Sequence, residues 1–407
     1  MPSTSGRQFQ QQAPRTHAQH EYQLKLKSMT YGELEEWCRS VGESAKRAMQ
    51  LWRWMYADGQ WMSNIEDTVG TTTGFSQGFV DKFNSKITVS GGLELKEVVT
   101  AKDGTRKMAF KLTEGPAKGG VIETVLIPVV REAGQRCRIT ICLSTQVGCA
   151  MNCQFCYTGR MGLLGNLSTA QVVEQIVHAK RYLAEQGDRT PLTNVVFMGM
   201  GEPLHNMEVV LNAIEIMKCP LGLHMSPGKL TVSTVGLVPE IREFVSRSSK
   251  VQLAVSLHAT TDEVRDWIVP VNRRHNLESL VSCLGELFPI DGEDRSRIVL
   301  IEYIMLRGVN DTEEDAHRLL NLLSKVRAKI NLILFNPHAG TKFLPSETEV
   351  VSRFRSILIQ GGRVCTVRDS RGDDEMAACG QLGDIGLAFK PAPMLPTPEK
   401  FTAVVAA

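Results

Sequence analysis

The sequence predicts an α/β protein. Its core is a partial barrel of six parallel βα units, with a small N-terminal helical module and a short antiparallel β extension. From Arg138 onward, apolar strand-like runs alternate with amphipathic helical stretches. Strands joined in this way form parallel sheets that are buried on both faces. Six units are too few for a closed eight-stranded barrel, so we expect an open barrel with its active site at the carboxyl ends of the strands.

The composition is that of an ordinary globular protein. The length of 407 residues allows one large domain with appendages, or two to three domains. Hydrophobic residues make up 43%, and 46 basic against 44 acidic residues leave a net charge of +2, so a strongly basic nucleic-acid-binding protein is not indicated. Ten scattered cysteines without a secretory signal fit a reducing compartment. No apolar run reaches about 18 residues, so we expect no membrane partner.

Changes in composition predict the domain boundaries. Residues 1–20 contain no acidic residue and are typical of a transit peptide or a disordered tail, which places the protein in the cytoplasm, or in a plastid or mitochondrion if the tail is a transit peptide. Residues 21–87 carry tryptophans at helical spacing and form the helical module, where RNA binding is expected. Residues 88–136 alternate like strands, residues 137–386 form the core, and residues 387–407 read as a flexible tail.

The elements of the core follow in order. Ser168-Thr-Ala-Gln171 is a capping box that begins the first long helix. The predicted parallel strands are residues 138–143, 194–198, 229–233, 251–257, 297–305 and 329–335. The predicted helices that follow the first one are residues 207–217, 239–247, 313–326 and 348–359.

Three cysteines lie on one short loop directly after the first parallel strand. Cys149, Cys153 and Cys156 are spaced four and three residues apart. Soft thiolates at this density select zinc, copper(I) or an iron–sulfur cluster. A closed structural site normally has four protein ligands, so three cysteines favour an open cluster with one free metal position. The alternative is a zinc knuckle whose fourth ligand lies elsewhere.

Small and polar residues follow the other strands at the same rim. Gly199-Met-Gly-Glu-Pro203 follows the second strand, where its glycines allow close backbone approach and Glu202 is suited to binding an ammonium group. Ser233, Ser256-Leu257-His258 and Asn336 end later strands. Each alone is typical of a cap or turn. Together they predict one polar pocket at one end of one sheet.

These motifs resemble a known family. Cys149, Cys153 and Cys156 carry the CxxxCxxC spacing of the radical S-adenosylmethionine superfamily. Over roughly residues 24 to 386 the chain resembles the dual-specificity ribosomal RNA adenine C2-methyltransferases. The matching segments are Ser144–Cys149, Met198–Pro203, Val269–Asn272 and Arg371–Leu382. The chain departs from the family pattern at Tyr157, where small residues look more usual, and at Leu334, where proline is frequent.

The resemblance implies a role for each matching residue. The three loop cysteines would ligate a [4Fe–4S] cluster, and S-adenosylmethionine would chelate its fourth iron. Cys379 would carry the methyl group, Cys142 would be the resolving thiol and Glu123 the proton acceptor. Without the resemblance, a single Glu on a strand is more often solvated. The residues implied to hold S-adenosylmethionine are Gly201, Glu202, Ser233, Ser256, Leu257, His258 and Asn336.

The implied reaction uses two cofactor molecules. The first methylates Cys379, and the second yields a 5′-deoxyadenosyl radical that activates the new methyl group for addition to carbon 2 of adenine. Cys142 then releases the product as a disulfide forms with Cys379. The implied partners are ribosomal RNA, with transfer RNA as a second substrate, and an electron donor such as flavodoxin or ferredoxin; the protein is expected to be a monomer.

Two alternatives remain open. One is methylation at carbon 8 of the same adenine, and the other is a non-catalytic iron–sulfur or zinc protein that binds RNA. The target base must leave its stack to reach the cluster, so we expect a flipped or single-stranded adenine. Basic residues near the predicted rim that are candidates for phosphate contacts are Arg136, Arg138, Lys229, Arg273, Arg274 and Arg371.

Overall fold

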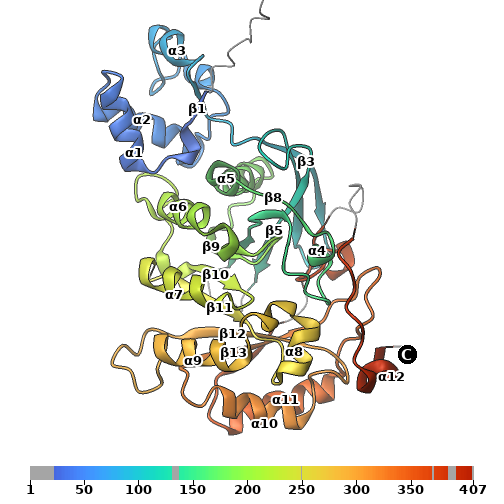
Figure 1. Ribbon diagram of the computed structural model, residues 1–407. Coiled ribbons are helices and arrows are strands. Elements are labelled where there is room, and N and C mark those ends of the chain that lie inside the picture. The colour runs from blue at the N-terminus through green and yellow to red at the C-terminus, as the bar shows by residue number, and fades with distance from the viewer. Residues whose placement is uncertain (1–22, 131–136, 249, 369–370, 384–390, 406–407) are drawn as a thin grey trace, which may run out of the picture.

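The computed structural model describes residues 23–130, 137–248, 250–368, 371–383 and 391–405. Arg136 and the predicted tail at residues 1–20 lie outside these ranges. The fold is organised by a ten-stranded sheet in the order β14-β13-β12-β11-β10-β9-β6-β5-β4-β3 (Figure 1). Its parallel part consists of β6 (Arg138–Cys142), β9 (Leu192–Phe197), β10 (Leu230–Thr234), β11 (Gln252–Ser256), β12 (Val299–Met305), β13 (Ala328–Leu334) and β14 (Cys365–Arg368).

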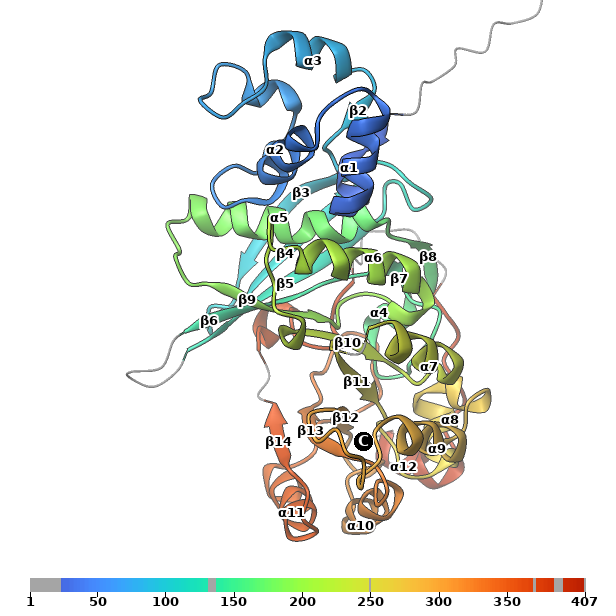
Figure 2. The ribbon, with the colours of Figure 1, turned by 90° about the vertical axis from the view of Figure 1, so that its left-hand side faces the viewer.

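The antiparallel extension continues this sheet. β5 (Val121–Val129) pairs antiparallel with β6, and β4 (Arg106–Leu112) and β3 (Leu93–Thr100) follow outward. The helices lie along one side of the curving sheet (Figures 1 and 2). They are α5 (Thr169–Glu185), α6 (Met207–Lys218), α7 (Val238–Arg247), α8 (Asp262–Ile268), α9 (Leu277–Leu287), α10 (Glu313–Leu322) and α11 (Thr348–Gln360).

The predicted fold class is confirmed, with one strand more than expected. The structure has a seventh parallel strand, β14, beside β13. It has only four residues, and one of them is buried, so it lacks the apolar run that marks the other strands. Helices α8 and α9 were also missed. In the part of the chain that the structure describes, no helix is both long and apolar enough to cross a membrane.

Helix α5 shows how local sequence fixes the core. The predicted capping box is present: the Gln171 amide donates to Ser168 Oγ at 3.3 Å, and the Ser168 amide donates to Gln171 Oε1 at 2.9 Å. The apolar side chains of the helix are buried against the sheet. Gln175, on the same helix, accepts hydrogen bonds from Thr124 Oγ1 at 2.7 Å and from the Ser144 amide at 2.9 Å. It therefore ties β5 to the loop that leads into the three cysteines.

The N-terminal module comprises β1 (Leu24–Lys25), η1 (Leu26–Ser28), α1 (Tyr31–Ser40), α2 (Ala45–Tyr56), η2 (Ile65–Thr68), α3 (Gln77–Phe83) and β2 (Ile87–Thr88). Trp52 is fully buried, with its ring 4.7 Å from that of Tyr56, as expected for a core tryptophan. Lys27 forms a buried ion pair with Glu174 of α5 at 2.9 Å. Hydrophobic packing and this ion pair seat the module on the main domain.

The C-terminal residues differ from the expected flexible tail. Residues 392–395 contact the cysteine loop, and the segment continues into η7 (Glu399–Phe401), which packs on α8, and α12 (Thr402–Val405). The Ala392 amide donates to the Arg160 carbonyl at 2.7 Å, and the Leu395 amide donates to Gln154 Oε1 at 2.8 Å. The ring of Phe401 stacks on Trp267 at 5.3 Å. The Pro-rich composition predicted a flexible tail. The contacts could not be predicted because their partners are far away in the sequence.

Candidate active site

The three cysteines of the loop line one cavity. Cys149 follows β7 (Gln146–Gly148), and Cys153 and Cys156 precede the short helix α4 (Tyr157–Arg160). The loop is fixed by backbone hydrogen bonds from Cys149 to Gly162 at 2.8 Å and from Cys156 to Cys153 at 3.0 Å. The cavity has a volume of about 950 Å³ including its open mouth. It lies at the carboxyl ends of the parallel strands, where the sequence predicted it.

The donor chemistry of this loop fits a cluster. Burial raises the pKa of each of the three thiols, and the charges of Cys149 and Cys156 raise that of Cys153 further. Without a metal these thiols are therefore protonated, and a bound metal centre would hold them as thiolates and balance their charge. Among the described residues, no three His, Cys, Asp or Glu side chains converge to hold a single metal ion. Three thiols that line one cavity fit a [4Fe–4S] cluster, in which each cysteine binds a different iron.

The loop after β9 brings Gly201 and Glu202 to the same cavity. Gly201 has a φ of 103°, and a Cβ atom there would lie 2.6 Å from Cβ of Gln146, so only glycine fits. Glu202 is buried, and its carboxylate accepts hydrogen bonds from the Leu204 amide at 3.0 Å and the Val235 amide at 2.9 Å. Burial raises the pKa of Glu202 from 4.5 to about 7, although these hydrogen bonds oppose the rise.

The structure brings most of the predicted cofactor residues together. Ser233 on β10, Ser256 on β11 and His258 line the same cavity as Gly201, Glu202 and the cysteines. Leu257 is fully buried behind this wall, and its backbone amide donates to the Glu302 carbonyl at 3.1 Å. Asn336 lines an adjoining second cavity instead.

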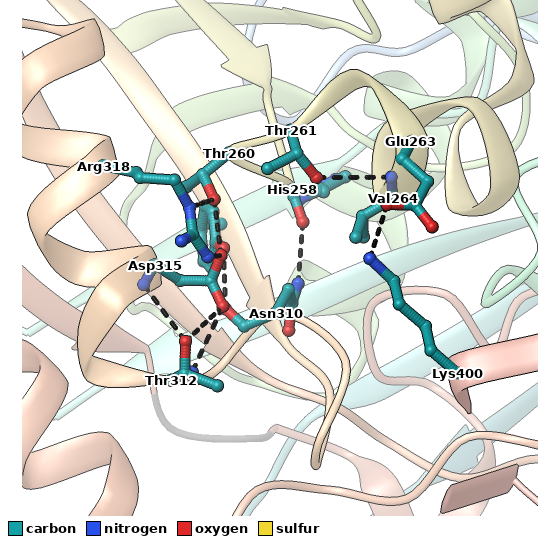
Figure 3. Close-up of polar contacts among 11 residues, drawn as sticks. His258, Thr260, Thr261, Glu263, Val264, Asn310, Thr312, Asp315, Arg318 and Lys400 are labelled. Carbon is teal, nitrogen blue, oxygen red and sulfur yellow. Dashed lines mark hydrogen bonds and ion pairs between the residues drawn. The ribbon is translucent and has the colours of Figure 1, made fainter. Parts of the chain in front are cut away.

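His258 is held in an unusual backbone conformation. Its φ of 61° lies in the left-handed region, which is costly for a residue other than glycine. Fully buried Asn310 donates to the His258 carbonyl at 2.7 Å (Figure 3). It also donates to the Ile304 carbonyl at 2.7 Å. Burial lowers the pKa of His258 to about 3, so its ring is neutral. The Ile304 amide donates to Nδ1 at 3.1 Å, which leaves the proton on Nε2 as a donor for a ligand.

Cys142 and Cys379 meet at the second cavity. Cys142 ends β6 and is buried, and both sulfur-bearing residues line this space of about 470 Å³. Cys379 also lines the cavity of the three loop cysteines. Burial raises the pKa of Cys142 to about 12, against the opposing charge of Arg368. Cys379 therefore borders both cavities, as do Met198, Ile333, Arg368 and Leu382, and it shares the second cavity with Cys142.

The segment that carries Cys379 is fastened at several points. The Tyr157 amide donates to the Gly380 carbonyl at 2.8 Å, and Gln381 Nε2 donates to the Pro337 carbonyl at 3.0 Å. Glu123 of β5 accepts from the Gly383 amide at 2.7 Å and pairs with Lys107 at 3.1 Å. Glu123 is thus buried against this segment rather than solvated, but it is not a wall residue of either cavity.

Three polar residues of the site were missed. Asn310 fixes His258, and Glu302 and Arg368 line the cavity of the three cysteines. Glu302 is buried within β12, and Arg368 ends β14. A charged residue inside an otherwise apolar strand is the only signal that the sequence offers for Glu302. Arg368 and Asn310 carry no such signal because their partners are set by tertiary structure.

Comparison with known proteins adds independent support. Residues 143–320 match the family model of the Radical SAM superfamily. The dual-specificity RNA methyltransferase RlmN of Syntrophotalea carbinolica is 40% identical over 88% of this chain and 89% of its own length. The protein of the same name from Geotalea uraniireducens is 41% identical over 88% of this chain and 96% of its own. The crystal structure of a radical SAM methyltransferase from Sphaerobacter thermophilus aligns with a TM-score of 0.78 and 36% identity, over 88% of this chain and 99% of that one.

These relatives agree with the donor set of the cavity. The Radical SAM superfamily uses a [4Fe–4S] cluster held by three cysteines together with S-adenosylmethionine. The three-cysteine loop and the cavity beside it supply a place for both groups. The chain belongs to the RlmN family of dual-specificity RNA methyltransferases, within the Radical SAM superfamily.

Proposed function

We propose that this enzyme methylates carbon 2 of an adenine in large-subunit ribosomal RNA, and also in transfer RNA. The observation that carries the proposal is the position of Cys379. It borders both the cavity of the three loop cysteines and the cavity that contains Cys142. A methyl carrier must reach the cofactor at one moment and the resolving thiol at another, and one side chain at the junction of two cavities meets both needs.

The first cavity is the proposed cofactor site. Cys149, Cys153 and Cys156 would hold the cluster, and Glu202 would bind the ammonium group of S-adenosylmethionine. When bound, these groups supply a transferable methyl group and a hydrogen-abstracting radical. His258, whose ring proton lies on Nε2, is proposed to donate a hydrogen bond to the cofactor. The remaining residues proposed to line the cofactor site are Gly201, Ser233 and Ser256, whereas Leu257 lies behind its wall and Asn336 borders the second cavity.

The second cavity is the proposed site of methyl transfer and release. Cys379 would accept the methyl group and later join the adenine through it. Cys142 would attack the sulfur of Cys379 and release the product as a disulfide forms, which an external reductant then cleaves. Glu123 is proposed as the proton acceptor. The Glu123 carboxylate accepts a hydrogen bond from the Gly383 amide and forms an ion pair with Lys107. The proposed role therefore requires the segment of residues 371–383 to shift when RNA binds.

The product nucleoside tests the proposal. The reconstituted enzyme is incubated with S-adenosylmethionine, a reductant and a ribosomal RNA transcript, and the digested RNA is analysed by mass spectrometry against 2-methyladenosine and 8-methyladenosine standards. We expect 2-methyladenosine, and none with Cys379→Ala. Exclusive formation of 8-methyladenosine would overturn the choice of carbon, and cofactor cleavage without any methylated adenine would overturn the function.

RNA is proposed to rest on the N-terminal module. A groove there is lined by Lys46, Arg53 and Trp54, which offer two cations for phosphates and an aromatic face for a base. We expect Lys46→Ala with Arg53→Ala to weaken RNA binding while cofactor cleavage is retained. Exposed Lys96→Ala on β3, outside the groove, is the matched control. Equal RNA affinity of the double variant and the control would remove the groove from the interface.

The electron donor, the oligomeric state and the compartment are also proposals. Flavodoxin or ferredoxin would reduce the cluster. The enzyme would act as a monomer in the cytoplasm, or in a plastid or mitochondrion. All ten cysteines are unpaired in the structure, which suits a reducing compartment. Light scattering of the purified chain and reduction of its cluster by each protein donor are the direct measurements.

A further inference from the structure

Arg368 occupies a position that the roles described so far do not use. It ends β14, the strand at the edge of the sheet, and its side chain lines the cofactor cavity and the second cavity. It also lines a third, open cavity of about 820 Å³ on the same sheet. Its Nη1 atom lies 3.9 Å from the sulfur of Met198. One guanidinium therefore stands where all three spaces meet.

The charge around Arg368 comes from the two proposed reactive thiols and one carboxylate. Burial lowers the pKa of Arg368, but Cys379, Glu302 and Cys142 act in the opposite direction, and the net effect is a raised pKa. Glu302 is itself held by Asn331 Nδ2 at 2.8 Å. Arg368 therefore stays positively charged beside both sulfur atoms.

Most of the surroundings of Cys142 oppose its ionisation. Burial raises the pKa of Cys142 to about 12 and the charge of Cys379 acts in the same direction, whereas the charge of Arg368 and, to a smaller extent, a backbone hydrogen bond with Met198 favour the thiolate. The neighbouring strands contribute no charge to the cavity wall here. From β5, from the residue that follows β9 and from the end of β13, the residues at this wall are Val125, Ile127, Met198, Ile333 and Leu334.

One more cation lines the same cavity. Arg371 reaches it from the segment that carries Cys379, but its guanidinium lies 3.8 Å from Asp103 and its side chain is 41% exposed. Asp103 and solvent therefore offset the charge of Arg371. The thiolate is the attacking form of cysteine, so the cation that favours it sets how much nucleophile is present.

We propose that Arg368 is a positioning residue that activates Cys142 as a nucleophile, by holding one positive charge beside the sulfur atoms of Cys142 and Cys379. The inference rests on the roles proposed above for these two cysteines. The step is the ionisation of Cys142, whose proton passes to solvent through the second cavity, which Cys142 lines. It requires no further reactant. Arg368 acts through Cys142 and needs no contact with RNA or cofactor.

The test measures alkylation of Cys142 by iodoacetamide in the anaerobically reconstituted, full-length enzyme without RNA. Peptide mass spectrometry follows Cys142 from pH 7.5 to 9.5, where the rate should rise about tenfold per pH unit. An opposite charge nearby shifts a pKa by about 1–3 units, so Arg368→Met should slow alkylation at least about tenfold at each pH. Arg368→Lys keeps the charge and should restore most of the rate.

Arg371→Met is the matched control, since it removes a cation from the same cavity wall. It should leave the Cys142 rate within about twofold of the parent. Cys283, fully buried in α9, reports any general opening of the fold. If Arg368→Met exposes Cys283, Arg368→Gln takes its place in the comparison. Equal Cys142 rates in the neutral and charged Arg368 variants, with Cys283 protected, would overturn the proposal, as would equal slowing by Arg371→Met.

Failure of this proposal can be distinguished from failure of the proposed function. If the alkylation rate of Cys142 is the same in all Arg368 variants, Arg368 does not activate Cys142, and the methylation proposal is unaffected. A failure to form 2-methyladenosine with normal Cys142 alkylation removes the methylation proposal and leaves the electrostatic role of Arg368 in place.

Discussion

The Glu202→Gln variant should change stability and cofactor binding in opposite directions. In the cofactor-free fold, burial raises the pKa of Glu202 from 4.5 to about 7. Ionisation of this carboxyl therefore opposes folding. Below pH 4.5 both the folded and unfolded states hold the proton and no penalty exists. The penalty grows as the pH rises and is complete above pH 7.

The size of the effect follows from these two pKa values. Between pH 5 and pH 8 the penalty grows by about 2–3 kcal/mol. Glutamine cannot ionise and avoids it. However, its amide oxygen can accept from only one of the two amides, Leu204 and Val235, that Glu202 satisfies. That loss costs about 1 kcal/mol at every pH. Glu202→Gln should thus be slightly less stable than the parent at pH 5, and more stable at pH 8.

Urea unfolding of the cluster-free chain, followed by tryptophan fluorescence, measures this crossover. Glu97→Gln, on an exposed position of β3, is the control and should show no such pH dependence. In the reconstituted enzyme the parent should bind the cofactor more tightly than the variant, because the variant lacks the carboxylate that pairs with the cofactor's ammonium group. We expect affinity for S-adenosylmethionine to fall roughly tenfold to over a hundredfold. A stability difference that is the same at pH 5 and pH 8 would refute the assignment of Glu202 as a carboxylate held ready in a buried site.

Three further changes test other parts of the site. Cys153→Ala should abolish the broad visible absorption of the reconstituted cluster, and full iron content with an unchanged spectrum would reject the ligand assignment. Asn310→Ala should release the left-handed backbone of His258, so calorimetry should show weaker cofactor binding with an intact cluster spectrum; unchanged affinity would contradict its positioning role. Phe401→Ala should destabilise the fold by about 3 kcal/mol in urea unfolding, because Phe401 is 8% exposed and stacks on Trp267, whereas a truly free tail predicts no change.

The sequence was most informative where local pattern and chemistry coincide. The six long strands were predictable because each is an apolar run followed by turn residues. The cysteine loop and the Gly201-Glu202 turn were predictable because their spacing has few other uses. Their convergence on one cavity followed from the rule that parallel strands end at the same rim.

Other features could not be predicted because they are settled by distant contacts. β14 is a short edge strand whose role is visible only once it pairs with β13 and delivers Arg368. Asn310 reads as a loop residue until it is seen beneath the carbonyl of His258. The C-terminal segment looks like a tail until Phe401 meets Trp267. In each case the local sequence leaves the partner undetermined.

The most direct test of the account uses Cys142→Ala. If Cys379 carries the methyl group and Cys142 releases the product, removal of Cys142 leaves the radical chemistry intact and blocks release. The reconstituted variant, given S-adenosylmethionine, reductant and RNA, should accumulate a covalent protein–RNA species that is retarded on a denaturing gel. The double variant Cys142→Ala with Cys379→Ala should form none. A Cys142→Ala enzyme that folds, cleaves the cofactor and never crosslinks to RNA would contradict the account.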